Sequence, residues 1–219
     1  MKQQTITLNA ITLGTFVIVA LINLGCQSTS LERSQLDSSD SCLILVGHGA
    51  PPSDFPREKL STYFRLHGRV HDHSGGGHDH RQDPLVQAIP DPQERNQFVS
   101  LEKELFDWPR NAQNDPYYMG VQDLADRLEK QTGKQVFFAF NEFCGPTVEA
   151  TVDRALSQGY KDITILTTMM VSGGGHSEHD IRVKVEHAQS HHPGVHIVYA
   201  WPYDPDALAS VMANQAERF

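Results

Sequence analysis

Three turns of this chain carry a side chain able to bind a metal ion or accept a proton, each shortly after an apolar segment. These side chains belong to His48, Glu142 and His176. Each apolar segment predicts a β-strand, and in an open parallel sheet the residues just beyond different strands lie at one edge. Two imidazoles and a carboxylate at one edge indicate a site for a divalent metal ion.

The surroundings of His48 fit two roles. This residue lies between Gly47 and Gly49. Glycines on both sides let the backbone turn sharply and let a bulky ligand come close, which favours a working histidine. A turn histidine that only hydrogen-bonds a neighbouring backbone group fits the same residues, so the sequence leaves both interpretations open.

Glu142 also has two interpretations. It follows a predicted strand and precedes Phe143. A carboxylate among bulky apolar side chains is suited to accepting protons near neutral pH. The alternative is a structural carboxylate that caps the following helix.

His176 stands at the start of a helix that we expect to run from Ser177 to about Ser190. At 100° per residue, this segment has two opposite sides: His176, His179, Asp180 and His187 on one, and Ile181, Val185 and Ala188 on the other. The apolar side should face the sheet. We interpret His179 and Asp180 as residues that could support His176, and His187 as part of a solvated face.

The spacing of His176 and His179 does not fit the zinc proteases, because the two histidines of their helical motif are four residues apart and these two are three apart.

Short apolar segments alternate with amphipathic ones from Gln113 onward. We expect strands at Cys42–Val46, Val136–Phe140, Ile163–Thr167 and Val195–Ala200. Helices should begin at Pro116 and Pro146, end before Gly133 and Gly159, and close the chain over about Asp206–Arg218. Strands separated by helices of this length predict an α/β fold with a parallel sheet and right-handed crossovers.

A long insertion, residues 51–111, separates the first strand from its expected helix. Arg57–Leu66 and Gln93–Phe106 have helical patterns. Between them, residues 71–80 form a polar, glycine-containing tract that attracts metal ions and cannot build a core. Its histidines are His71, His73, His78 and His80.

The first 25 residues predict a signal peptide. The apolar run Ala10–Leu24 is shorter than the roughly 20 residues of a membrane span and matches a signal-peptide core. Cys26 then becomes a candidate lipidation site, although the preceding residues also fit an uncleaved anchor. Residues 26–40 form a polar tether and residues 41–219 a single domain. We expect an exported protein that meets the membrane only through this N-terminal anchor.

The charge balance makes nucleic acid an unfavourable partner. The net charge is −9, from 18 basic and 27 acidic residues, with no block of lysines or arginines.

Four ordered segments together resemble the class II chelatases, the family of sirohydrochlorin chelatase and cobaltochelatase. They are Leu45–Gly49, Phe140–Ala150, Leu156–Leu166 and Ser172–Ile181. The resemblance implies a lyase-type enzyme of the small, single-domain kind, with a three-layer chelatase-like fold and a homodimeric state. Its activity would be the insertion of cobalt, nickel or iron into a sirohydrochlorin-like tetrapyrrole, without ATP or another nucleotide. Such a step belongs to cobalamin or siroheme biosynthesis.

The resemblance also implies roles for individual residues. His48 and His176 match the metal-binding and catalytic pair, and Glu142 matches the acidic residue after the second strand. An apolar cleft would hold the macrocycle, and its candidate walls are Phe143, Met169, Met170 and Trp201. Ordinary core packing is the alternative role for those four side chains.

Two features differ from typical members of that family, which are cytoplasmic. We expect this chain to be exported, and the insertion nearly doubles the first loop. A second function of a different class is therefore a surface-tethered protein that binds or delivers metal ions on an inactive chelatase scaffold. The tract from His71 to His80 supports this alternative, because such a tract collects ions without a preformed site.

Overall fold

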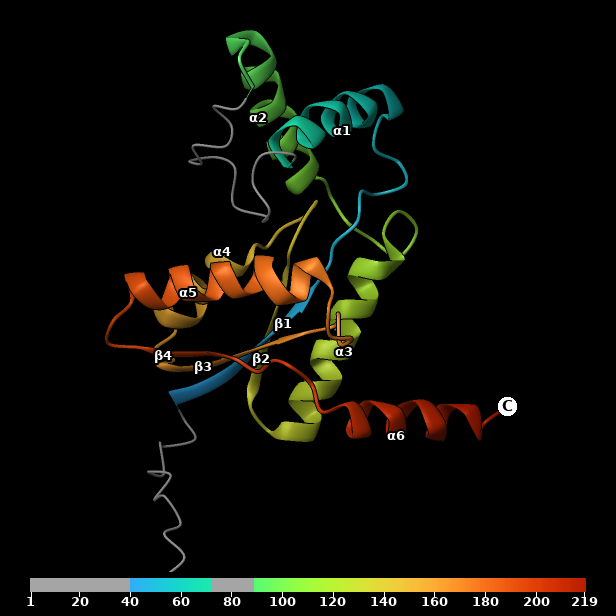
Figure 1. The fold of residues 1–219 in the computed structure, drawn as a ribbon, viewed down its shortest axis with the longest axis vertical. Coiled ribbons are helices and arrows are strands. Elements are labelled where there is room, and N and C mark those ends of the chain that lie inside the picture. The colour runs from blue at the N-terminus through green and yellow to red at the C-terminus, as the bar shows by residue number, and fades with distance from the viewer. Residues whose placement is uncertain (1–39, 72–88) are drawn as a thin grey trace, which may run out of the picture. The chain divides into compact units, whose positions relative to one another are not determined.

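Four parallel strands form the centre of the fold (Figure 1). The computed structural model describes residues 40–71 and 89–219. The strands are β1 (Ser41–Gly47), β2 (Gln135–Phe140), β3 (Asp162–Thr167) and β4 (His196–Tyr199), in the order β2-β1-β3-β4. The register pairs Gly47 with Phe140 and Val46 with Thr167. Three strands therefore end at the same level, and the residues that follow them lie at one edge.

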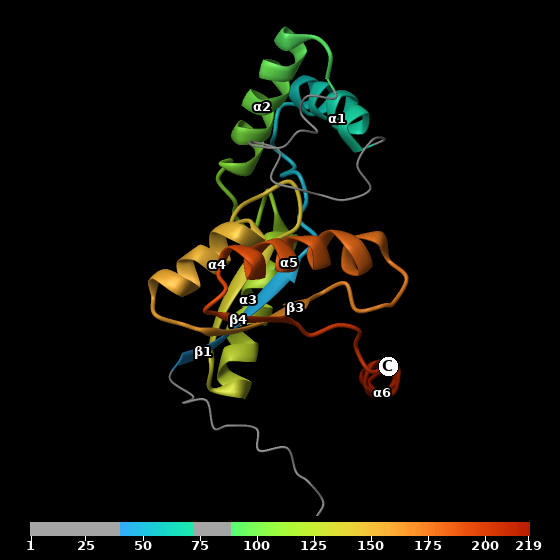
Figure 2. The same ribbon diagram turned by 60° about the vertical axis from the view of Figure 1, so that its left-hand side comes forward.

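Helices cover both faces of this sheet, as Figure 2 shows. Helix α3 (Pro116–Thr132) packs on the face that carries Leu43 and Leu45. Helices α4 (Val148–Ser157) and α5 (Ile181–His191) pack on the opposite face, against Ile44 and its neighbours. Successive strand residues point to opposite faces, so β1 contributes to both apolar layers. The predicted α/β fold with three layers is confirmed.

Local capping explains where two of the helices begin and end. Asp115 accepts a hydrogen bond from the Tyr118 amide, Pro116 occupies the first turn of α3, and Gly133 ends this helix with a left-handed φ of 67°. Helix α4 starts at Val148, so the prediction that Pro146 opens it is wrong by two residues. The Pro146 carbonyl accepts the Phe140 amide, and the Thr147 side chain provides the cap instead.

The helix after β3 does not begin as a regular α-helix. Residues His176–Asp180 form a π-helical turn, η3, in which the Ile181 amide donates to the His176 carbonyl. Regular α5 starts only at Ile181. Asp180 lies beside His176, four residues along the chain, which agrees with the expectation that both residues share one side of this segment.

The insertion contains the two predicted helices, which are confirmed as α1 (Arg57–His71) and α2 (Pro92–Phe106). Their apolar side chains form a cluster of their own, to which Phe143 of the main body contributes. His71 ends α1, whereas His73, His78 and His80 lie outside the described residues. The cluster packs an element of the insertion directly against the turn that carries Glu142.

The remaining described helix, α6 (Pro205–Ala216), follows β4 and has no buried residue. The expected signal peptide, Cys26 and all but the last residue of the expected tether lie outside the described residues. Within the described ranges, no helix has the length and apolar character needed to cross a membrane. The described residues all belong to one unit, Gln35–Phe219.

Candidate metal centre

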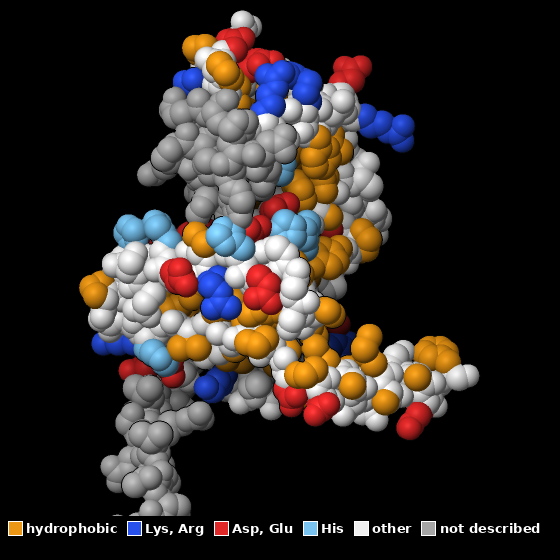
Figure 3. All heavy atoms as spheres, in the orientation of Figure 1, with side chains coloured by type: hydrophobic (Ala, Val, Ile, Leu, Met, Phe, Trp, Pro, Cys, Tyr) orange, Lys and Arg blue, Asp and Glu red, His pale blue; other side chains and the backbone are white. Residues whose placement is uncertain are grey.

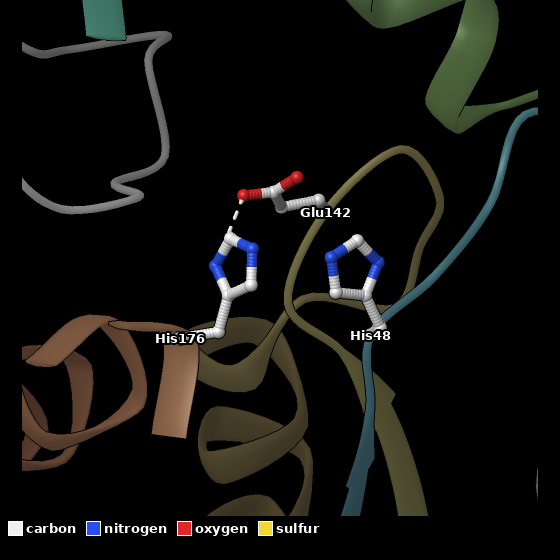
Figure 4. A group of neighbouring side chains, drawn as sticks. All are labelled: His48, Glu142 and His176. Carbon is white, nitrogen blue, oxygen red and sulfur yellow. Dashed lines mark ion pairs between the residues drawn. The ribbon is translucent and has the colours of Figure 1, made fainter. Parts of the chain in front are cut away.

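The structure brings His48, Glu142 and His176 together at the edge of the sheet (Figure 4). Each offers a ligand atom, and these atoms all lie within 4.8 Å of one another. The ring centroids of His48 and His176 are 4.6 Å apart, and the rings are nearly perpendicular. A metal ion with bonds of about 2.0–2.2 Å would hold such atoms roughly 3–3.5 Å apart, so small side-chain rotations suffice.

Backbone hydrogen bonds hold the turns of His48 and Glu142 together. The Asn141 amide donates to the Gly47 carbonyl, and the Glu142 amide donates to the His48 carbonyl, both at 2.9 Å. Gly49 has a φ of 94°, and a Cβ atom there would lie 1.9 Å from the Glu142 carbonyl oxygen. Only glycine fits this close approach.

The ring of His48 is oriented by its own turn. Its Nδ1 atom lies 2.8 Å from the Gly49 carbonyl oxygen. A carbonyl only accepts hydrogen bonds, so Nδ1 carries the proton and Nε2 keeps a free lone pair. The backbone contact expected for a plain turn histidine is therefore present, and it also leaves the other nitrogen available to a metal ion.

The ring of His176 is oriented by a carboxylate. Its Nδ1 atom lies 2.6 Å from Asp180 Oδ2 and 3.5 Å from Glu142 Oε1. The hydrogen bond to Asp180 is the main cause that raises the pKa of His176, and the negative charge of Glu142 raises it further. A carboxylate on one nitrogen of a histidine fixes the ring and makes the other nitrogen a better ligand.

The two neighbours expected to support His176 lie in different surroundings. Asp180 is buried and bonds the His176 ring. His179 is exposed, and among the described residues it has no recorded contact with the three-residue group.

The four candidate cleft walls lie in different surroundings. Phe143 is buried, with its ring 6.0 Å from that of His48, and it also packs against aromatic side chains of α1. Met169 packs against the main core, and Met170 is exposed. Trp201 stacks on Tyr199. Of the four, Phe143 alone has a recorded contact with the metal-ligand group in the described part of the chain.

A buried lysine beside the site was not found by the sequence analysis. Lys184 Nζ donates to the carbonyl and the side-chain oxygen of Asn141, at 2.8 Å and 2.9 Å. Asn141 Nδ2 lies 3.3 Å from His176 Nδ1. The sequence did contain an indication of this lysine, because Lys184 lies on the apolar side of α5, between Ile181 and Val185. A charged residue at a position that faces the core indicates a specific partner.

Arg110, at the end of the insertion, ties both site turns together and was also missed. Its guanidinium donates to the Ala50 and Phe143 carbonyls, at 2.6 Å and 2.8 Å. It also forms a buried ion pair with Asp115, the residue that caps α3. One cation thus connects the turn after β1, the turn after β2 and the start of α3.

Comparison with family models finds one match to this chain. Residues 113–218 match the CbiX family model. These residues make up just under half of the chain, and this segment is similar to the CbiX family. The match confirms the resemblance to the class II chelatases. No curated protein matches the chain.

Two solved structures with related descriptions are similar to this chain. One is a protein of Marinobacter aquaeolei VT8 described as a CbiX protein of cobalamin (vitamin B12) biosynthesis. It has 17% identity and a TM-score of 0.43, over 82% of this chain and 99% of that chain. The other is the sirohydrochlorin chelatase SirB of Bacillus subtilis subspecies spizizenii in complex with cobalt. It has 14% identity and a TM-score of 0.37, over 81% of this chain and 50% of that chain.

Proposed function

We propose that this protein inserts a divalent metal ion into a sirohydrochlorin-like tetrapyrrole without ATP, as a lyase-type chelatase. Cobalt, nickel and iron are the candidate ions, and the ion is a substrate rather than a resident cofactor. The observation that carries the proposal is the convergence of His48, Glu142 and His176 in a chain with a CbiX-family segment.

The chemistry of metallation explains why these residue types are needed. The ion must lose water, and two pyrrole nitrogens must lose protons. Neutral imidazoles hold a divalent ion while leaving other coordination positions open to the macrocycle. His48 and His176 are both oriented with Nε2 free for this role.

Glu142 is the candidate acceptor for the pyrrole protons. Its side chain is largely buried, and its Oε1 lies 3.5 Å from His176 Nδ1. A carboxylate beside the ion and the macrocycle can accept these protons. Asp180 would act on the reaction only through His176, as a positioning residue.

Turnover of variants tests the proposal. A tetrapyrrole and Co²⁺ are mixed with the protein, and the visible absorbance of the metallated product is followed. His48→Ala and His176→Ala should each reduce the rate by about 10²-fold or more. His196→Ala is the matched control, because His196 is an exposed histidine that bonds Asp162 at the opposite edge of the sheet. Wild-type turnover in the double variant His48→Ala/His176→Ala would contradict the proposal.

Metal delivery on an inactive scaffold remains the second candidate function. The sequence of residues 71–80, with four histidines, favours it. Deletion of this tract separates the two functions. A delivery protein should then lose metal transfer to an acceptor chelator, whereas a chelatase should keep its maximal turnover and lose only apparent metal affinity.

We also propose that the protein is exported and anchored through Cys26, on the basis of the N-terminal sequence. Labelling with an alkyne fatty acid in a bacterial host tests this. The wild-type chain should be labelled and Cys26→Ala should not; equal labelling of both would contradict the proposed anchor.

A homodimer is the proposed assembly. Helix α6 contributes no residue to the core, and its Val211 and Met212 side chains are 66% and 72% exposed. Val198 on the edge strand β4 is also exposed. Apolar side chains on a terminal helix and on a neighbouring sheet edge suit a second copy of the same chain.

A further inference from the structure

A groove opens between α4 and α5, which lie side by side in both ribbon views (Figures 1 and 2). Its volume is about 330 Å³. The floor is apolar and is formed by Val152 and Ala188, which also belong to the main core. The rim carries five side chains, all able to bind a cation: Glu149, Asp153, His187, His191 and His192.

The spacing of the rim residues places them in two pairs. Glu149 and Asp153 are four residues apart on α4, and His187 and His191 are four residues apart on α5. Residues at this spacing are neighbours on one face of a helix. A pair of carboxylates therefore lies across the groove from a pair of imidazoles.

The two imidazoles already lie close together. Their ring centroids are 4.1 Å apart. His191 Nδ1 lies 2.9 Å from the His187 carbonyl oxygen, so this nitrogen donates and Nε2 is left free. His192 Nε2 lies 3.5 Å from Asp153 Oδ1, a contact that joins the two helices across the groove. Figure 3 shows histidine side chains gathered at the C-terminal end of α5.

One carboxylate oxygen of the groove lacks a partner. Glu149 Oε2 is buried and accepts no hydrogen bond from the described residues. A buried carboxylate oxygen normally has a donor or a cation beside it. The two carboxylates on the rim suit a cation.

We propose that this groove is a second metal site, which binds a first-row divalent transition-metal ion through the neighbouring imidazoles of His187 and His191, with Glu149 and Asp153 on the facing helix attracting the ion by their negative charge. Imidazole and carboxylate together suit cobalt, nickel and zinc. His187 lies eleven residues after His176, about 16 Å along a helical axis, so the site is separate from the first. The proposal does not depend on the chelatase activity.

Residue-specific chemical modification tests the proposal on the full chain. Diethyl pyrocarbonate modifies free imidazole nitrogens, and mass spectrometry reads each histidine separately. With Co²⁺ alone as the probe, modification of His187 and His191 should slow by about tenfold at saturation, because a coordinated nitrogen has no free lone pair. The exposed His196 is the internal control and should be unaffected.

Two variants give the experiment its decisive outcomes. Glu149→Gln should raise the Co²⁺ concentration needed for half-protection by about tenfold, because a negative charge beside the ion is lost. His48→Ala/His176→Ala should leave the protection of His187 and His191 unchanged. Loss of metal binding at the first site can therefore be told apart from loss of metal binding in the groove. Modification of His187 and His191 at the same rate with and without Co²⁺, or equal protection of His196, would overturn the proposal.

Discussion

At the level of single residues, neighbouring oxygen atoms determine which nitrogen of each site histidine can bind a metal ion. The Gly49 carbonyl occupies Nδ1 of His48, and Asp180 occupies Nδ1 of His176. Both histidines therefore offer Nε2. The sequence indicated Asp180 as a possible support of His176 and a backbone contact as one interpretation of His48. It did not indicate which ring nitrogen each contact would occupy, because that depends on the local backbone geometry.

The raised pKa of His176 makes metal binding depend on pH. A metal ion binds the neutral ring, so it must displace the proton that Asp180 and Glu142 stabilise. We expect Co²⁺ affinity to rise by up to about tenfold per pH unit as the pH increases toward this pKa, and to level off above it. Calorimetric titrations across the range of histidine ionisation measure the slope. Affinity that is independent of pH would contradict this assignment of the ligand.

Replacing Asp180 with Asn separates its two effects on His176. The main cause of the raised pKa is removed, so affinity should level off at a lower pH. Loss of the orienting carboxylate should also reduce the affinity plateau by about 10–100-fold. Glu186→Gln, on the exposed face of α5, is the control. If Asp180→Asn gives the wild-type pH curve, Asp180 does not position His176.

At the level of elements, local signals predicted most of the fold. The apolar segments gave the four strands, and Asp115, Pro116 and Gly133 marked the limits of α3 through capping and backbone geometry. Features that depend on distant contacts were not predictable. Helix α4 begins late because the Pro146 carbonyl bonds Phe140, and Lys184 is buried because Asn141 accepts its hydrogen bonds.

Arg110 connects the turns after β1 and β2 with the start of α3, and its replacement tests this connection. Arg110→Ala would leave Asp115 buried without its cation, and the free energy of unfolding should fall by about 3–5 kcal/mol. Arg127→Ala is the matched control, because its ion pair with Asp123 is exposed and should matter little. Urea denaturation measures both variants. Equal stability of Arg110→Ala and wild type would show that this cation does not hold the site turns together.

At the level of the whole molecule, the insertion and the sheet meet beside the candidate metal centre. Phe143 follows Glu142, contacts the His48 ring and belongs to the apolar cluster of α1 and α2. The sequence predicted both helices of the insertion. It did not predict that their core would include a residue from the turn after β2, since that contact depends on tertiary packing.

The proposed homodimer is also tested at this scale. Val211→Asp/Met212→Asp should place two charges in the apolar face of α6 and convert dimers to monomers, because buried unpaired charges are costly. Sedimentation equilibrium measures the mass. Ser210→Asp, which adds a charge on the other side of the same exposed helix, should remain dimeric. A monomeric wild-type chain, or a double variant that still forms dimers, would contradict this interface.

The most direct measurement of the central claim is anomalous diffraction from a crystal of the protein with Co²⁺. We predict an anomalous peak within about 2.0–2.2 Å of Nε2 of both His48 and His176, with Glu142 as a nearby ligand or proton acceptor. A Co²⁺ ion bound to only one of the two histidines, or the two rings turned away from a common ion, would contradict the account.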